Sequence, residues 1–177
     1  MKNIIFSVVL IFSMFCSYGQ QTQDTDSPTN FNEIKLNGLY LVIGAFDITY
    51  ERTINQESAY GLNVFLPFDD DIDINYYISP YYRFYFGKKY AAGFFLEGFG
   101  MLNSLVESRF NDSNGDFFLV EENVTDFALG IGLGGKWLTN SGFIGELNFG
   151  IGRNLFNASD TDEDIVAKIG ISLGYRF

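Results

Sequence analysis

The feature that most constrains this chain is the strict alternation of residue types along its final segment, IVAKIGISLGYRF. From Ile165 to Phe177 every second residue is apolar, and the residues between them include Lys168, Arg176 and two glycines. Alternation over this length is typical of a β-strand whose two faces meet different surroundings. The apolar face either covers a core while the other meets water, or meets lipid while the other lines a polar interior.

Similar alternation recurs upstream, in stretches separated by turn residues. Including the last, eight strands are predicted, over residues 34–43, 46–54, 59–68, 75–87, 90–108, 124–139, 142–156 and 165–177. No segment among them shows a helical repeat with capping residues. The sequence therefore predicts an all-β protein.

The connections between the predicted strands fall into two length classes. Short turns follow the second, fourth and sixth strands, and longer loops (69–74, 111–123 and 157–164) follow the third, fifth and seventh. The short link near Gly44, after the first strand, is an exception. Short turns at one rim and long loops at the other are the plan of an outer-membrane barrel. We therefore predict an eight-stranded antiparallel up-and-down transmembrane β-barrel over residues 33–177.

The N-terminal segment predicts where the chain goes. Lys2 precedes an apolar run of about a dozen residues, and small residues precede Gln20, which is the pattern of a secretory signal peptide over residues 1–19. Residues 20–32 are polar and lack periodicity, so we expect a disordered lead-in. The mean hydropathy of +0.06 is too polar for a helical membrane protein but suits a barrel with one polar face. The expected location is the cell outer membrane.

The predicted inward face carries charges in the middle of its strands. Seven residues form the predicted lumen ion-pair network: Lys35, Glu51, Arg83, Glu97, Lys136, Glu146 and Lys168. An eight-stranded barrel is just wide enough for side chains to fill it, and charges enclosed there must pair or stay hydrated. Inward tyrosines and phenylalanines of strands four and five would pack against the bare glycines of strands six to eight. The network is therefore read as part of a closed plug, with a conduction path as the alternative.

Residue types argue against several classes of function. The chain has no histidine and its single cysteine, Cys16, lies in the predicted signal peptide, so no Ser-His-Asp or Cys-His site can form in the mature chain. We predict no enzymatic activity and no cofactor. A net charge of −11 disfavours a nucleic-acid partner, whose phosphates need cationic surface.

Two acidic loops have the alternate-carboxylate spacing that can converge on Ca²⁺. The residues are Asp69, Asp71, Asp73, Asp160, Asp162 and Asp164. Neither loop has the glycine and the terminal glutamate of an EF-hand, so these are weak metal candidates. A solvated acidic rim that attracts divalent cations loosely is the simpler interpretation.

Three stretches resemble an uncharacterised family of small Gram-negative outer-membrane barrels: ITYER (48–52), SPYYRFYFG (79–87) and AAGFFLEGFG (91–100). The architecture is also similar to OmpA-, OmpX- or OmpW-type eight-stranded barrels. The ending GYRF resembles the C-terminal signal of bacterial outer-membrane barrels, which implies that Tyr175 and Phe177 are read by the barrel-assembly machinery. This resemblance implies fold and location, and no activity.

The sequence as a whole predicts an integral outer-membrane β-barrel with a structural or surface-interaction role, a filled lumen and acidic extracellular loops. Outer-membrane lipid and lipopolysaccharide are its expected surroundings. One alternative is a secreted or periplasmic lipocalin-like barrel that binds a lipophilic ligand in its lumen. Another is a narrow solute channel.

Overall fold

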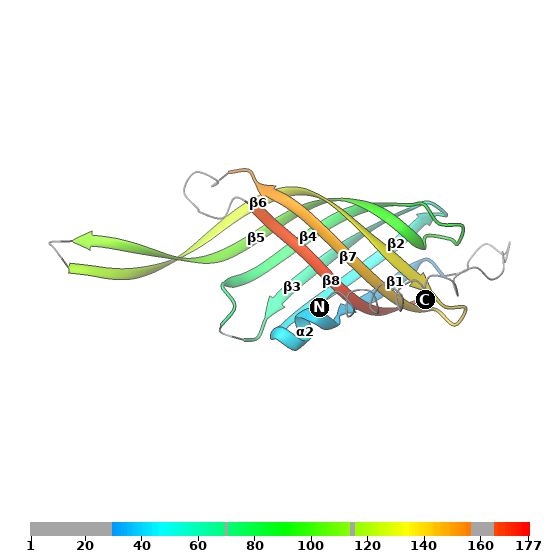
Figure 1. Ribbon diagram of the computed structural model, residues 1–177, viewed down its shortest axis with the longest axis horizontal. Helices are drawn as coiled ribbons and strands as arrows, with labels where there is room; N and C mark the ends of the chain where they lie inside the picture. Colours follow the sequence, from blue (N-terminus) through cyan, green and yellow to red (C-terminus); the bar gives the residue numbers. More distant parts are fainter. Residues whose placement is uncertain (1–29, 70, 114–115, 157–164) are drawn as a thin grey trace, which may run out of the picture.

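The computed structural model describes residues 30–69, 71–113, 116–156 and 165–177. Its strands are β1 (Asn32–Asn37), β2 (Ala45–Asn55), β3 (Ser58–Pro67), β4 (Ile74–Tyr85), β5 (Gly93–Ser113), β6 (Asp116–Leu138), β7 (Phe143–Asn154) and β8 (Ile165–Arg176). Each strand pairs antiparallel with its sequence neighbour, and β1 pairs with β8, so the sheet closes into a barrel (Figure 1). The predicted eight-stranded up-and-down barrel is confirmed. Within the described ranges, no helix is long and apolar enough to cross a membrane.

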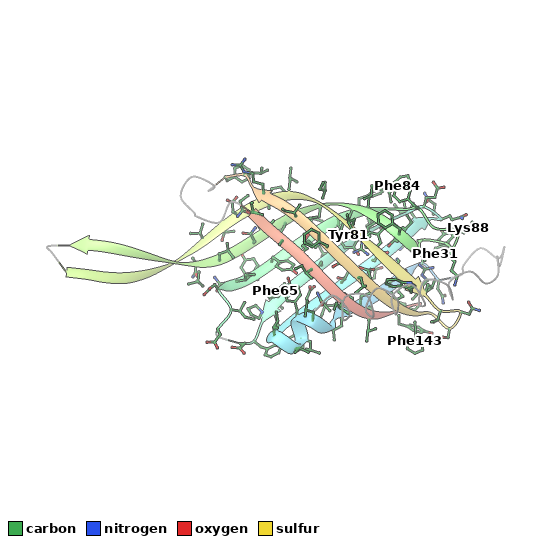
Figure 2. The ribbon with its side chains drawn as sticks, in the orientation of Figure 1. Phe31, Phe65, Tyr81, Phe84, Lys88 and Phe143 are labelled. Atoms are coloured by element: carbon green, nitrogen blue, oxygen red, sulfur yellow. The ribbon has the colours of Figure 1, made fainter. Side chains whose placement is uncertain are left out.

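The two faces of the wall are sorted as the alternation predicts. In β8, for example, Ile169, Ile171 and Leu173 are exposed on the outside, whereas Lys168 and Ser172 are buried inside. Figure 2 shows the same sorting: Tyr81 and Phe65 lie inside the barrel, and Phe84 and Phe143 project from its outer surface. Because side chains alternate across a strand, one register decides which face every residue of that strand occupies.

The predicted first strand is wrong in its second half. β1 ends at Asn37, and residues 38–43 form a short helix, α2 (Gly38–Ile43). The Asn37 side chain caps the helix by accepting a hydrogen bond from the Leu39 N–H, and Gly44 ends it with φ of 104°. A left-handed φ costs glycine little, which explains the break at this point. The connection after β1 therefore contains a helix and is no exception to the rule of long links at this end.

The predicted loop over residues 111–123 is also wrong. β5 continues to Ser113 and β6 begins at Asp116, and the two strands stay paired along their whole length. The pairing of β4 with β5 stops at Leu105, so the outer part of this hairpin extends beyond the barrel wall as a two-stranded ribbon (Figure 1). The polar residues there form strands because each one pairs across the hairpin.

Two ends of the barrel are named from these connections. The turn rim carries residues 56–57, 86–92 and 139–142, and the loop rim carries α2, residues 68–73 and the projecting hairpin. The chain enters at the turn rim, where the backbones of Asn32 and Phe177 hydrogen-bond each other in both directions. Asn32 thus belongs to β1 and not to the predicted lead-in of residues 20–32. The predicted signal peptide and the first ten residues of that lead-in lie outside the described residues.

Candidate functional site

The centre of the lumen is occupied by Glu51, whose carboxylate contacts three cations. Its oxygens lie 2.8 Å from Lys35 Nζ, 2.8 Å from Arg83 Nη1 and 2.5 Å from Lys136 Nζ. The hydroxyls of two tyrosines, Tyr81 and Tyr85, each donate a hydrogen bond of 2.8 Å to the same carboxylate. Five donors therefore surround this buried anion, three at Oε2 and two at Oε1.

Two further carboxylates share cations with Glu51. Glu146 accepts from Lys35 at 2.7 Å and from Arg83 at 2.8 Å. Glu97 lies 2.7 Å from Arg83 Nε and 2.7 Å from Lys168 Nζ. Arg83 thus holds three glutamates with one planar group. All seven predicted lumen residues are buried, and the structure brings them into one connected set.

Toward the turn rim the set continues through two residues that were not in the predicted network. Glu33 lies 2.9 Å from Lys136 Nζ, and Arg176 Nε donates to Glu33 at 2.8 Å. Arg176 also donates to the carbonyls of Tyr90 and Ala91, which ties β8 to the turn after β4. Parity could have found Glu33, because it lies two residues before Lys35 on the same face of one strand. We call these nine residues the ionic network: Glu33, Lys35, Glu51, Arg83, Glu97, Lys136, Glu146, Lys168 and Arg176.

Aromatic rings fill the space around the ionic network. The guanidinium carbon of Arg83 lies 4.1 Å from the ring centre of Phe95 and 4.4 Å from that of Tyr81. Lys168 Nζ lies 4.6 Å from the ring centre of Phe99. Such contacts stabilise a cation, more so where water is excluded. On the neighbouring strand β6, a Cβ at Gly130 or Gly134 would collide with the ring of its cross-strand partner, Phe99 or Phe95, so these glycines make room for the aromatic side chains.

The loop-side part of the lumen is built differently, around Asp47. Its carboxylate accepts from the side-chain amides of Asn37 (3.0 Å) and Asn63 and from the Tyr77 hydroxyl (3.2 Å). These donors are neutral. Phe65 stacks on Tyr77 with ring centres 4.8 Å apart and covers this polar group from the loop rim side. The predicted network did not include Asp47, although it shares the parity of Glu51.

A small polar cavity separates Asp47 from the ionic network. Its volume is about 10 Å³, measured as the space open to the centre of a water molecule, and its lining includes Asp47, Asn63, Lys168 and Ser172. A space of this size holds about one water molecule. The described lumen therefore offers no apolar chamber of the kind that a lipocalin uses.

Three of the weak metal candidates, Asp69, Asp71 and Asp73, lie within the described residues, and they form no group of metal ligands there. Asp69 accepts a hydrogen bond from the Asp71 backbone N–H at 3.1 Å, as in an ordinary Asx turn. No group of three or more histidine, cysteine, aspartate or glutamate side chains that could hold a metal ion occurs within the described ranges. Asp160, Asp162 and Asp164 lie outside the described residues.

The predicted assembly signal lies at the turn rim on the outer face. Tyr175 and Phe177 are both exposed, and the Tyr175 ring contacts Phe143 of the neighbouring strand at 5.5 Å between ring centres. Both aromatic side chains are therefore accessible from the outside of the barrel.

Comparison with known proteins supports the fold. The crystal structure of the N-terminal β-barrel domain of Pseudomonas aeruginosa OprF is similar to this chain with a TM-score of 0.59 and 13% sequence identity. The match covers 84% of this chain and 98% of that domain. No family model and no curated protein matches the sequence, so the resemblance to an uncharacterised barrel family stays a prediction. At this identity the likeness concerns the fold alone.

Proposed function

We propose that this chain is an integral protein of the cell outer membrane with a structural or surface-interaction role, and that it is not an enzyme. The observation that carries the proposal is the reversed polarity of the barrel. Its outer face is apolar from strand to strand, and its lumen contains charged side chains with almost no exposure. A soluble protein would expose this much apolar surface only at high cost, whereas lipid requires it.

The filled lumen favours a structural role over transport. The ionic network and the surrounding rings occupy the barrel from the turn rim to the small cavity beside Asp47. The lipocalin-like alternative would need an apolar interior, and a narrow channel would need a continuous aqueous path. Neither fits a lumen in which Glu51 and Arg83 are held by several partners each.

Membrane fractionation combined with a gel-shift assay tests this proposal. The full chain, produced in a Gram-negative host, should stay with the outer membrane after a carbonate wash, because its apolar face is held by lipid. It should also migrate faster on SDS gels when unboiled, since closed barrels resist SDS. Release of the protein into the soluble fraction would refute the membrane placement and favour the lipocalin-like alternative.

We also propose that Tyr175 and Phe177 are recognised by the barrel-assembly machinery, as the likeness of GYRF to that signal suggests. Phe177→Ala should lower the amount of assembled barrel several-fold, while its effect on the stability of refolded protein stays small because the side chain is half exposed. Phe86→Ala, which removes an exposed aromatic from the same rim outside β7 and β8, is the matched control. Equal amounts of assembled Phe177→Ala and wild-type protein would contradict the assignment.

A further inference from the structure

The seam between β1 and β8 is short because β1, with six residues, is the shortest strand of the barrel wall. These strands pair at five positions, from Glu33 with Arg176 to Asn37 with Ser172. On its other side β8 pairs with β7 along its full length, up to Ile165. The loop-side half of β8 therefore faces α2 where a strand would normally continue the wall (Figure 1).

The side chain of Asn37 takes the place of the missing strand. Asn37 Oδ1 accepts from the Ile171 N–H at 3.3 Å, and Asn37 Nδ2 donates to the Ile169 carbonyl at 3.0 Å. An open strand edge is not tolerated in hydrocarbon, so these contacts satisfy groups that lipid could not. Side-chain contacts of this kind can be exchanged for others without breaking a backbone ladder.

The small cavity lies directly behind this seam. Asn37, Ile169 and Ser172, which belong to the two sides of the seam, line it together with Asp47 and Asn63. Asn63 is only 5% exposed, and its Oδ1 has no hydrogen-bond partner. A buried acceptor without a donor is destabilising. The cavity therefore calls for a group that donates a hydrogen bond and is no larger than a water molecule.

Charge limits the identity of that group. With Asp47 included, the lumen between the cavity and the turn rim holds five cations and five anions: Lys35, Arg83, Lys136, Lys168 and Arg176 against Glu33, Asp47, Glu51, Glu97 and Glu146. An added ion would upset this balance in a region that excludes water, at considerable cost. A hydroxyl group is neutral, donates one hydrogen bond and accepts others.

The outer side of the seam is apolar. The residues of α2 after Gly38 are Leu39, Tyr40, Leu41, Val42 and Ile43, and Val42 is 86% exposed. No charged side chain belongs to the helix. A hydrocarbon tail that leaves the barrel beside α2 would therefore meet no charged side chain on this helix.

We propose that the seam is a lateral port and the cavity its head-group site, which together take a single-chain amphiphile with a hydroxyl head from the bilayer. The hydroxyl donates to the Asp47–Asn63 acceptors in place of a water molecule, and the tail passes out beside α2 into lipid. This inference rests on the proposed membrane placement, but the two are tested by different measurements.

NMR titration of the folded barrel in phosphocholine micelles tests the port. Addition of 1-decanol should give saturable shifts of the Asn63 side-chain amide and of the Ile169 and Ile171 backbone amides, since these groups line or close the cavity. Decyl methyl ether, which cannot donate a hydrogen bond, should give no saturable shift. Equal responses to both compounds, or no response to decanol, would overturn the proposal even if the barrel remains in the membrane on fractionation.

A cavity-filling variant sharpens the test. Ser172→Val should weaken the decanol response at least tenfold, because its methyl groups occupy the space. Ser104→Val, at a buried serine that does not line the cavity, is the matched control and should leave the response unchanged. Unaltered decanol binding in a folded Ser172→Val barrel would remove the cavity as the site. If that variant does not fold, the comparison of decanol with its ether in the wild type still decides.

Discussion

The turn-side and loop-side parts of the lumen bury charge in different ways. On the turn side, Glu51 is held by three cations and two tyrosine hydroxyls, and the strands around it are joined by continuous backbone ladders. On the loop side, Asp47 is held by neutral donors, and the wall beside it is completed by the side chain of Asn37 at the end of β1. The turn side depends on ion pairs and the loop side on exchangeable hydrogen bonds.

This difference indicates where the barrel gains its rigidity. When one member of a group of paired buried charges is removed, the opposite charges that it contacted are left without full compensation. Removing the charge of a carboxylate that is held by amides and a hydroxyl lowers the stability of the barrel less, because these donors can turn to other acceptors or to water. We therefore expect the turn side to set the stability of the barrel and the loop side to be the part that can open.

Neutralising the central carboxylate on each side should give the largest contrast. Glu51→Gln removes one carboxylate that three buried cations share, which leaves one positive charge in the lumen uncompensated, and should lower the free energy of unfolding by about 3–5 kcal/mol. Asp47→Asn keeps the size of the side chain and breaks no described ion pair, so about 1–3 kcal/mol is expected. Urea unfolding of refolded protein, followed by the gel shift, measures both. A larger loss for Asp47→Asn than for Glu51→Gln would reverse the assignment of the two sides.

The pair Arg83–Glu97 tests whether the ionic network acts as a unit. Glu97→Gln and Arg83→Gln should each lower the temperature at which the fast-migrating gel form is lost. The effect of Arg83→Gln should be larger, because Arg83 contacts three glutamates. The double variant should cost less than the sum of the single variants, since residues in one network couple by about 0.5–3 kcal/mol. Strict additivity would mean that the 2.7 Å contact between Arg83 and Glu97 contributes little.

Much of the architecture could be predicted because the barrel obeys a period of two. The parity that places Leu173 outside also places Lys168 inside, and a single error of register would have reversed every strand face. The same parity brings the seven charged residues into the lumen without any knowledge of their partners. Which carboxylate sits at the centre could not be predicted, since that depends on strand tilt and side-chain length.

The errors have local causes. The segment GLYLVI is apolar at almost every position, so it shows no helical period, and six residues are too few to reveal one. Its signals were the flanking residues, Asn37 as a cap and Gly44 as a stop. The outer part of the β5–β6 hairpin was read as a loop for its polar residues, although the pair Asn114-Gly115 is of the type favoured in tight two-residue turns. Glu33 was overlooked because the predicted lead-in ended beside it.

Alanine substitutions of glycines should distinguish the packed inner face of the wall from its open outer face, with a smaller change in the free energy of unfolding than the charge variants. Gly134→Ala places a Cβ against the Phe95 ring and the Leu147 carbonyl, and Gly130→Ala places one against the Phe99 ring. Overpacking of this kind costs about 1–3 kcal/mol. Gly98→Ala is the matched control in a neighbouring strand, because nothing lies within 4 Å of its added Cβ. Urea unfolding should rank the two inward variants below this control; equal stabilities would show that the lumen is not tightly packed.

Hydrogen exchange along β8 in micelles tests the contrast most directly, because this one strand runs through both parts. Alternate amides of a strand point to opposite neighbours. Those facing β1 at Leu173 and Tyr175, where the strands pair, should exchange slowly. Those at Ile169 and Ile171, which lie beyond the last paired position beside the Asn37 side chain, should exchange at least tenfold faster. Amides facing β7, at Lys168, Gly170 and Gly174, should be protected throughout and serve as the internal reference. Equal protection of all four amides on the β1 side would contradict the account, since the seam would then be as closed beside α2 as it is at the turn rim.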